Sequence, residues 1–157
     1  MYGEGVYTDS AFTFDTYKNK KDTLAALLGF VWRHGQSTDT GLGIDYMVEN
    51  FLPQGRPNAA QLAIVITDGA SQNPEKTALS AKTARDRGAT VLAVGVGSSI
   101  DEVELNNIAG NPDRVLTASD YSKLNSIKHE LIDLTCVGSE YKTNVFFALS
   151  AKHCSLN

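Results

Sequence analysis

Two short apolar runs joined by a helical segment constrain the fold of this chain more than any other feature. Residues 62–66 and 90–96 are almost continuously apolar, which is typical of strands buried on both faces of a sheet. Between them, Asn73 is suited to cap a helix and Pro74 to start one, and we expect that helix over residues 75–86. Strand, helix and strand in this order predict a βαβ unit with parallel strands.

The alternation of strands and helices continues on both sides of this unit. The remaining predicted helices span residues 21–30, 41–51, 100–108 and 121–134, a third strand spans 113–117, and two short edge strands lie at 6–7 and 12–14. We therefore predict an α/β, Rossmann-like fold with a mostly parallel central sheet and helices on both faces. Sheets of this kind bind ligands beyond the carboxyl ends of their strands, and Asp68 is expected at such an end.

Composition and charge argue against several classes of protein. The 157 residues fit one domain, and the net charge of −4 comes without the basic stripe that nucleic-acid binding needs. We interpret the one basic cluster, Lys18, Lys20 and Lys21, as a solvated turn. No apolar run is long enough for a transmembrane helix, and the first residues lack the pattern of a signal peptide. Nucleic-acid binding and membrane insertion are therefore not expected.

Two cysteines, Cys136 and Cys154, lie late in the chain. They are too few for a disulfide scaffold or for a zinc site with four cysteine ligands. They can pair with each other, pair with a cysteine outside this chain, or stay reduced. Cysteine usage alone therefore does not identify the cellular compartment.

The order of several short motifs resembles that of the von Willebrand factor type A domain. Residues 37–41 (Ser-Thr-Asp-Thr-Gly) precede a predicted helix, and the first apolar strand ends at residues 67–69 (Thr-Asp-Gly). Further matching motifs follow in the same order at 94–97, 104–110, 114–116 and 120–124. The resemblance covers residues 2–136 and implies the Rossmann-like fold already predicted. Residues 137–157 are left as a tail of uncertain structure, in which the apolar run 145–149 has no evident partner.

The resemblance implies a metal ion-dependent adhesion site that holds Mg²⁺, or Mn²⁺ or Ca²⁺, through oxygen ligands. The family motif begins with Asp-x-Ser-x-Ser after the first strand and continues with a threonine and an aspartate, which match Thr38 and Asp68. This chain contains no Asp-x-Ser-x-Ser motif. Thr38 and Asp68 alone offer one hydroxyl and one carboxylate, so we expect this chain to bind metal weakly or not at all.

The chain begins where the second strand of the family is expected, so a βα unit on the order of 30 residues is missing at its start. That first strand is central in the sheet of the family. Its absence predicts either two neighbouring strands with unpaired edges or two strands forced together, and a sheet split in this way should be marginally stable. Either the sequence is part of a longer protein that carries the unit upstream, or it is a natural short form.

The function implied by the resemblance is that of a non-enzymatic, protein-binding adhesion module in a secreted matrix or cell-surface protein. Its expected partners are extracellular matrix or cell-surface proteins such as collagen-like ligands, bound through the metal only in the complete domain. A metal-independent structural module that self-associates is the alternative, and a Mg²⁺-dependent hydrolase with Asp68 as nucleophile is a third reading. Family members often link a cysteine at the position of Cys136 to one before the first strand; here Cys154 is the substitute partner.

Overall fold

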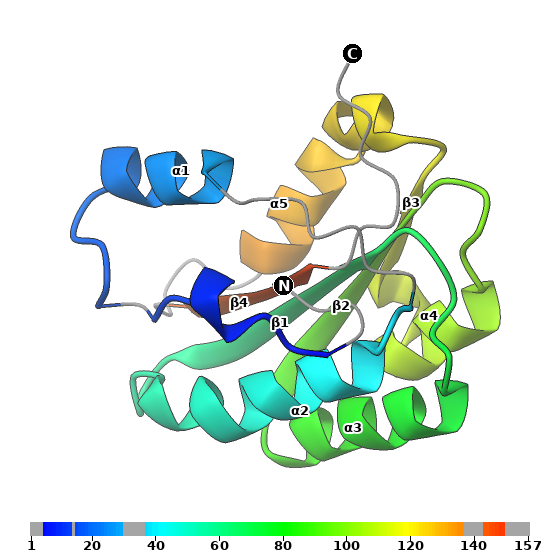
Figure 1. The fold of residues 1–157 in the computed structure, drawn as a ribbon, viewed down its shortest axis with the longest axis horizontal. Helices are drawn as coiled ribbons and strands as arrows, with labels where there is room; N and C mark the ends of the chain where they lie inside the picture. Colours follow the sequence, from blue (N-terminus) through cyan, green and yellow to red (C-terminus); the bar gives the residue numbers. More distant parts are fainter. Residues whose placement is uncertain (1–4, 14, 30–36, 137–142, 150–157) are drawn as a thin grey trace.

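The two apolar runs form adjacent parallel strands in the computed structural model, which describes residues 5–13, 15–29, 37–136 and 143–149 (Figure 1). β1 (Ala60–Thr67) pairs with β2 (Ala89–Val96) in a continuous parallel register. β3 (Val115–Ala118) pairs with the other edge of β2, and β4 (Thr143–Leu149) pairs with the other edge of β1. The result is a four-stranded parallel sheet in the order β3-β2-β1-β4.

Helices cover both faces of this sheet, so the predicted α/β architecture is confirmed (Figure 1). The α-helices are α1 (Lys20–Leu28), α2 (Thr40–Asn50), α3 (Pro74–Asp86), α4 (Glu102–Ala109) and α5 (Lys128–Cys136). Short 3₁₀ helices span Thr8–Ser10, Leu52–Gln54, Pro112–Arg114 and Tyr121–Ser126. No helix in the described ranges is both long and apolar enough to cross a bilayer.

The side chains of β1 alternate between two hydrophobic cores, one on each face of the sheet. Ala63 and Val65 pack in a core to which α2, α3 and α4 contribute. Leu62 and Ile64 point to the opposite core, which is completed by Ile127 and by partly buried leucines of α5. Because successive side chains of a strand point to opposite faces, a strand covered on both sides must be apolar throughout. This requirement explains the unbroken apolar run from which the fold was predicted.

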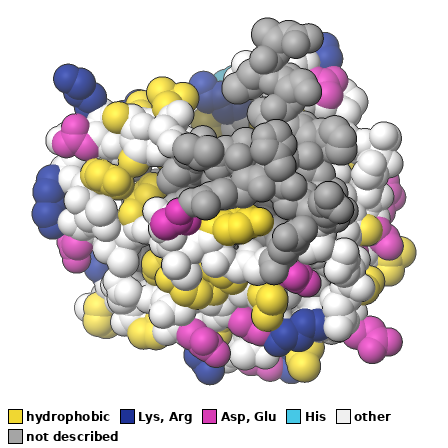
Figure 2. All heavy atoms as spheres, in the orientation of Figure 1, with side chains coloured by type: hydrophobic (Ala, Val, Ile, Leu, Met, Phe, Trp, Pro, Cys, Tyr) yellow, Lys and Arg dark blue, Asp and Glu magenta, His cyan; other side chains and the backbone are white. Residues whose placement is uncertain are grey.

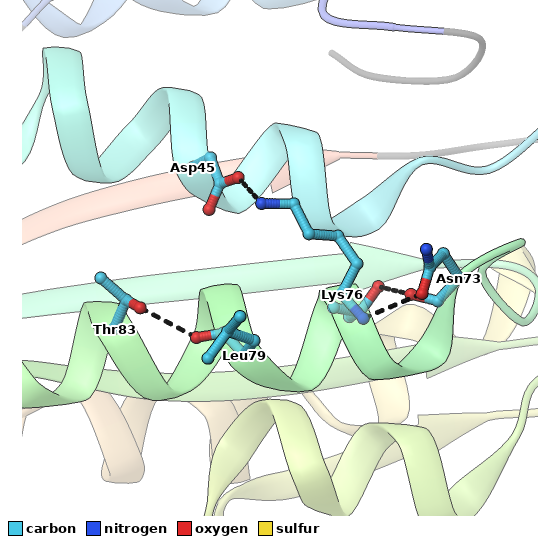
Figure 3. Close-up of polar contacts among 6 residues, drawn as sticks. Asp45, Asn73, Lys76, Leu79 and Thr83 are labelled. Carbon is cyan, nitrogen blue, oxygen red and sulfur yellow. Dashed lines mark hydrogen bonds and ion pairs between the residues drawn. The ribbon is translucent and has the colours of Figure 1, made fainter.

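Side chains at the helix ends fix where α3 begins and how it contacts α2. The side-chain oxygen of Asn73 accepts a hydrogen bond of 2.9 Å from the amide of Lys76, as expected for a helix cap, and Pro74 occupies the first helical position (Figure 3). The ammonium of Lys76 forms an ion pair with Asp45 on α2 (Figure 3). The helix predicted over residues 75–86 is thus confirmed at both ends.

The helix predicted over residues 121–134 is divided into two, which corrects that expectation. Asp120 caps the 3₁₀ helix by accepting a hydrogen bond of 2.8 Å from the amide of Ser122, and the hydroxyl of Ser126 donates to the carbonyl of Lys123 at 2.6 Å. Such local bonds from side chain to backbone compete with the α-helical pattern. The α-helix α5 therefore begins only at Lys128.

The two short edge strands predicted near the start of the chain are not formed within the described residues. Residues 5–13 contain the 3₁₀ helix Thr8–Ser10 instead of a strand pair, and Phe14 lies outside the described residues. A strand needs a neighbour with free backbone groups to pair with. The free edge of β1 is taken by β4, which enters the sheet from the other end of the chain.

Helix α1 forms as predicted but does not bury the apolar face expected of it. Asn19 caps it by accepting a hydrogen bond of 3.0 Å from the amide of Asp22. Leu24, Leu27 and Leu28 nevertheless remain exposed, Leu28 by 87%. Figure 1 shows α1 set apart from the sheet, and Figure 2 shows apolar side chains at the surface on that side of the molecule. This helix is held by local bonds rather than by packing.

Candidate functional site

The direction of the strand order changes at β1. The chain passes from β1 to β2 and β3 through α3 and α4 on one face of the sheet, and returns through α5 on the other face to β4. The strand order therefore reverses between β1 and β4. Doubly wound sheets bind their ligands at such a reversal, outside the carboxyl ends of the strands. Asp68 is the first residue after β1 and lies at this position, as predicted.

Three consecutive backbone amides fix the loop that follows Asp68, each bonded to a different part of the chain. The amide of Ala70 donates to the carbonyl of Ser99 at 3.0 Å, in the loop before α4. The amide of Ser71 donates to the carboxylate of Glu104 on α4 at 2.8 Å. The amide of Gln72 donates to the carbonyl of Thr38 at 3.1 Å. The loop is thereby held in one conformation, and the segment of Thr38 lies against it.

Thr38 is fully buried, with an exposed fraction of 0%, and its hydroxyl oxygen has no hydrogen-bond partner in the part of the chain that the structure describes. The hydroxyl of Thr40, at the start of α2, is in the same situation. A buried hydroxyl without a partner costs about 1–3 kcal/mol, so such groups generally serve a ligand, an ion or a water molecule. These two hydroxyls therefore point to a polar ligand at this end of the sheet.

Thr38 and Asp68 lie on neighbouring segments at this end of the sheet. A threonine hydroxyl and an aspartate carboxylate are the oxygen donors that Mg²⁺ and Ca²⁺ prefer, and the Gln72–Thr38 hydrogen bond joins the two segments that carry them. Within the described ranges, however, no group of three or more His, Cys, Asp or Glu side chains is placed to hold a metal ion. Thr38 and Asp68 carry oxygen atoms of the kind that such a site uses, but two ligands are too few to form it.

Three buried polar residues at this site were not predicted from the sequence: Thr40, Ser71 and Glu104. The hydroxyl of Thr77 on α3 donates to that of Ser71 at 3.0 Å, which ties the loop to a second helix. Glu104 is only 5% exposed and shares the buried face of α4 with Ile108, one turn later. A glutamate at an apolar position of the helical repeat was the signal that could have revealed it.

Several residues considered from the sequence contribute nothing to the described site. Asp39 precedes α2, and its side chain makes no capping hydrogen bond. His129 is exposed on α5. Cys136 is the last residue of α5, but Cys154 lies outside the described residues, so the disulfide between them stays a prediction.

Comparisons with known proteins agree with the α/β fold described above. The sequence model of the von Willebrand factor type A domain family matches residues 1–130. The chain is 32% identical over 127 residues to the mouse collagen alpha-4(VI) chain, and 34% identical over 131 residues to mouse matrilin-1. Each match covers 80% of this chain, but only 5% of the collagen chain and 25% of matrilin-1. The chain thus spans a quarter or less of the length of these relatives.

A solved structure shows the same fold. It is that of proximal thread matrix protein 1 from the mussel byssus, with a TM-score of 0.76 and 30% sequence identity. The match covers 80% of this chain and 33% of the other. A second structure of that mussel protein is described as having a zinc-occupied MIDAS motif, with the same TM-score and coverage.

Proposed function

Because this chain belongs to the von Willebrand factor type A family, we propose that it is a non-enzymatic protein-binding module of a secreted matrix protein. The observation that carries the proposal is the fixed loop after β1, which holds Asp68 at the strand reversal beside the segment of Thr38. Relatives named as collagen and matrilin support a place in the extracellular matrix. We propose matrix or cell-surface proteins with collagen-like segments as the partners.

We further propose that binding depends on a divalent cation only in a complete domain. Thr38 and Asp68 would hold Mg²⁺, Mn²⁺ or Ca²⁺ together with the Asp-x-Ser-x-Ser motif that this chain lacks. When bound, the cation supplies positive charge that attracts a carboxylate of the partner. The unpartnered hydroxyl of Thr38 and the zinc-occupied motif of the mussel relative support this proposal.

The test compares binding to immobilised collagen with and without Mg²⁺, using this chain alone and a chain extended at its start by a βα unit that carries the Asp-x-Ser-x-Ser motif. In the protein with a complete site, Asp68→Ala should weaken binding by about tenfold or more, because a metal ligand is lost. Chelation with EDTA should have the same effect. Glu49→Ala is the matched control, since it removes an exposed carboxylate near the opposite end of α2. We expect this variant to bind like the unmodified protein.

The alternative is a metal-independent assembly module that acts through its surfaces. The same experiment separates the two functions. If Asp68→Ala and EDTA leave binding unchanged in the protein with a complete site, metal-dependent adhesion is wrong. Self-association that persists in EDTA would then support the assembly function.

A further inference from the structure

The edge of β1 that faces away from β2 is occupied by a strand from the distant C-terminal part of the chain. β4 pairs with β1 in parallel, from Thr143 opposite Ala60 to Leu149 opposite Ile66. The centre of β1 is buried in the sheet, since Leu62, Ala63, Ile64 and Val65 are between 0% and 4% exposed. Without β4, this segment would present a row of unpaired amides and carbonyls along an apolar surface.

An apolar strand with a free edge is a general acceptor for other strands. Proteins usually protect such edges with charged side chains, proline or bulges. Neither β1 nor β4 contains a charged residue or proline, and both strands consist mainly of apolar residues. Nothing in the sequence of either strand therefore prevents β1 of one molecule from pairing with β4 of another.

The position of β4 in the chain makes an exchange between molecules simple. β4 is the last described element, and residues 137–142 separate it from the end of α5. The other three strands are linked in sequence through α3 and α4, so they form a unit that β4 joins from outside. Exchange of an identical element keeps every strand contact and is a low-cost route to a dimer.

We propose that the edge of β1 covered by β4 is a strand-acceptor site at which two copies of this chain exchange β4. The occupant is the β4 of a second copy of the same chain, because that strand has the same sequence and can therefore form the same register and residue pairs. The proposal does not rest on the metal site, since no residue that it uses is a candidate metal ligand. The result is a reciprocal dimer in which each sheet is completed by its partner.

The test uses full-length chains that each carry one engineered cysteine, in a background with Cys136→Ser and Cys154→Ser. One variant carries Ala60→Cys and the other Thr143→Cys, two positions that lie opposite each other in the β1–β4 register. The two variants are mixed at high concentration, warmed to allow exchange, and oxidised gently. We expect a covalent dimer on a non-reducing gel, because the two cysteines meet only when β4 of one chain lies on β1 of the other.

Two controls make every outcome decisive. A single chain with both cysteines should form the intramolecular disulfide, which shows that the register is correct. A mixture of Thr143→Cys with Thr117→Cys, an exposed position on β3, should give no dimer. If only the doubly substituted chain forms a disulfide, β4 stays in its own molecule and the proposal is wrong. It is equally wrong if no disulfide forms in any sample, or if both mixtures dimerise to the same extent.

Discussion

Glu104 connects the stability of the molecule to the shape of its candidate site. Its carboxylate accepts the hydrogen bond from the amide of Ser71, and both residues are buried. In Glu104→Ala this amide loses its partner, so the free energy of unfolding should fall by about 1–3 kcal/mol. Urea denaturation measures the change. Glu102→Ala on the exposed side of the same helix is the control and should lie within about 0.5 kcal/mol of the unmodified protein.

Glu104→Gln separates hydrogen bonding from charge. The amide oxygen of glutamine can still accept the hydrogen bond from Ser71, so this variant should lose less stability than Glu104→Ala. Equal losses in the two variants would contradict the role given to this bond.

The residues of the site differ in how far the sequence reveals them. Asp68 follows an apolar run directly, which predicts its position at a strand end, and Thr38 and Asp68 were proposed as ligands because they match the family motif. Ser71 and Glu104 are 33 residues apart in the sequence, and no local pattern around either residue predicts the hydrogen bond between them. The sequence thus points to the two candidate ligands, whereas the bonds that fix the loop after Asp68 depend on the packing of α4 against β2.

At the scale of the elements, Asp120 controls the start of the 3₁₀ helix Tyr121–Ser126. Hydrogen bonds to its carboxylate, first of all from the hydroxyl of Ser122, hold the pKa of Asp120 below its ordinary value. A carboxyl group whose pKa is lower in the folded state stabilises the fold above its unfolded pKa, which is about 3.9. This contribution is lost as the pH falls through the lower, folded value.

Asp120→Asn tests this coupling because asparagine also caps helices but carries no charge. Near pH 7 the variant should melt slightly below the unmodified protein, because the contribution of the ionised carboxylate is lost, and the gap should narrow at low pH. Below about pH 4 the unmodified protein should lose stability more steeply than the variant. Thermal melts between about pH 2.5 and 7 give the difference between the two curves, which cancels the titration of the other carboxylates. Parallel curves over this range would contradict the assignment.

The helices and the central strands were predictable because their signals are local. Asn73 and Pro74 mark the start of α3, and Gly110, with a left-handed φ of 70°, terminates α4. The division of the last helix was not predictable from apolar spacing, since Leu124 and Leu131 keep helical spacing across the break. Hydrogen bonds of Asp120 and Ser126 determine the conformation of residues 121–126, and the spacing of apolar residues does not predict such bonds.

At the scale of the whole molecule, the partner of β4 was the least predictable feature. The apolar run 145–149 stands out in the sequence, but strand pairing depends on which edge is free elsewhere in the fold. Unpaired edges were expected where a central strand is missing, but β4 pairs with that edge of β1. That the C-terminal strand occupies this edge emerges only when all the elements are assembled.

Proline substitutions test whether β4 belongs to the same cooperative unit as the rest of the sheet. Phe146 and Phe147 lie opposite Ala63 and Ile64 at the centre of the β1–β4 register. Neighbouring amides of a strand point to opposite sides, so only one of the two donates to β1. Proline at that position removes a hydrogen bond of the sheet and should lower the free energy of unfolding by about 1–3 kcal/mol. Proline at the other position should cost clearly less.

The two variants are matched to each other, because each replaces one phenylalanine of the same strand. Unfolding in urea, followed by circular dichroism and by the fluorescence of Trp32, should remain a single transition in both. A lowered midpoint in one variant, with coincident curves from the two probes, means that β4 unfolds together with the sheet. If neither proline shifts the midpoint, β1 does not need β4 for its stability. The β1–β4 pairing would then not be part of the cooperative core.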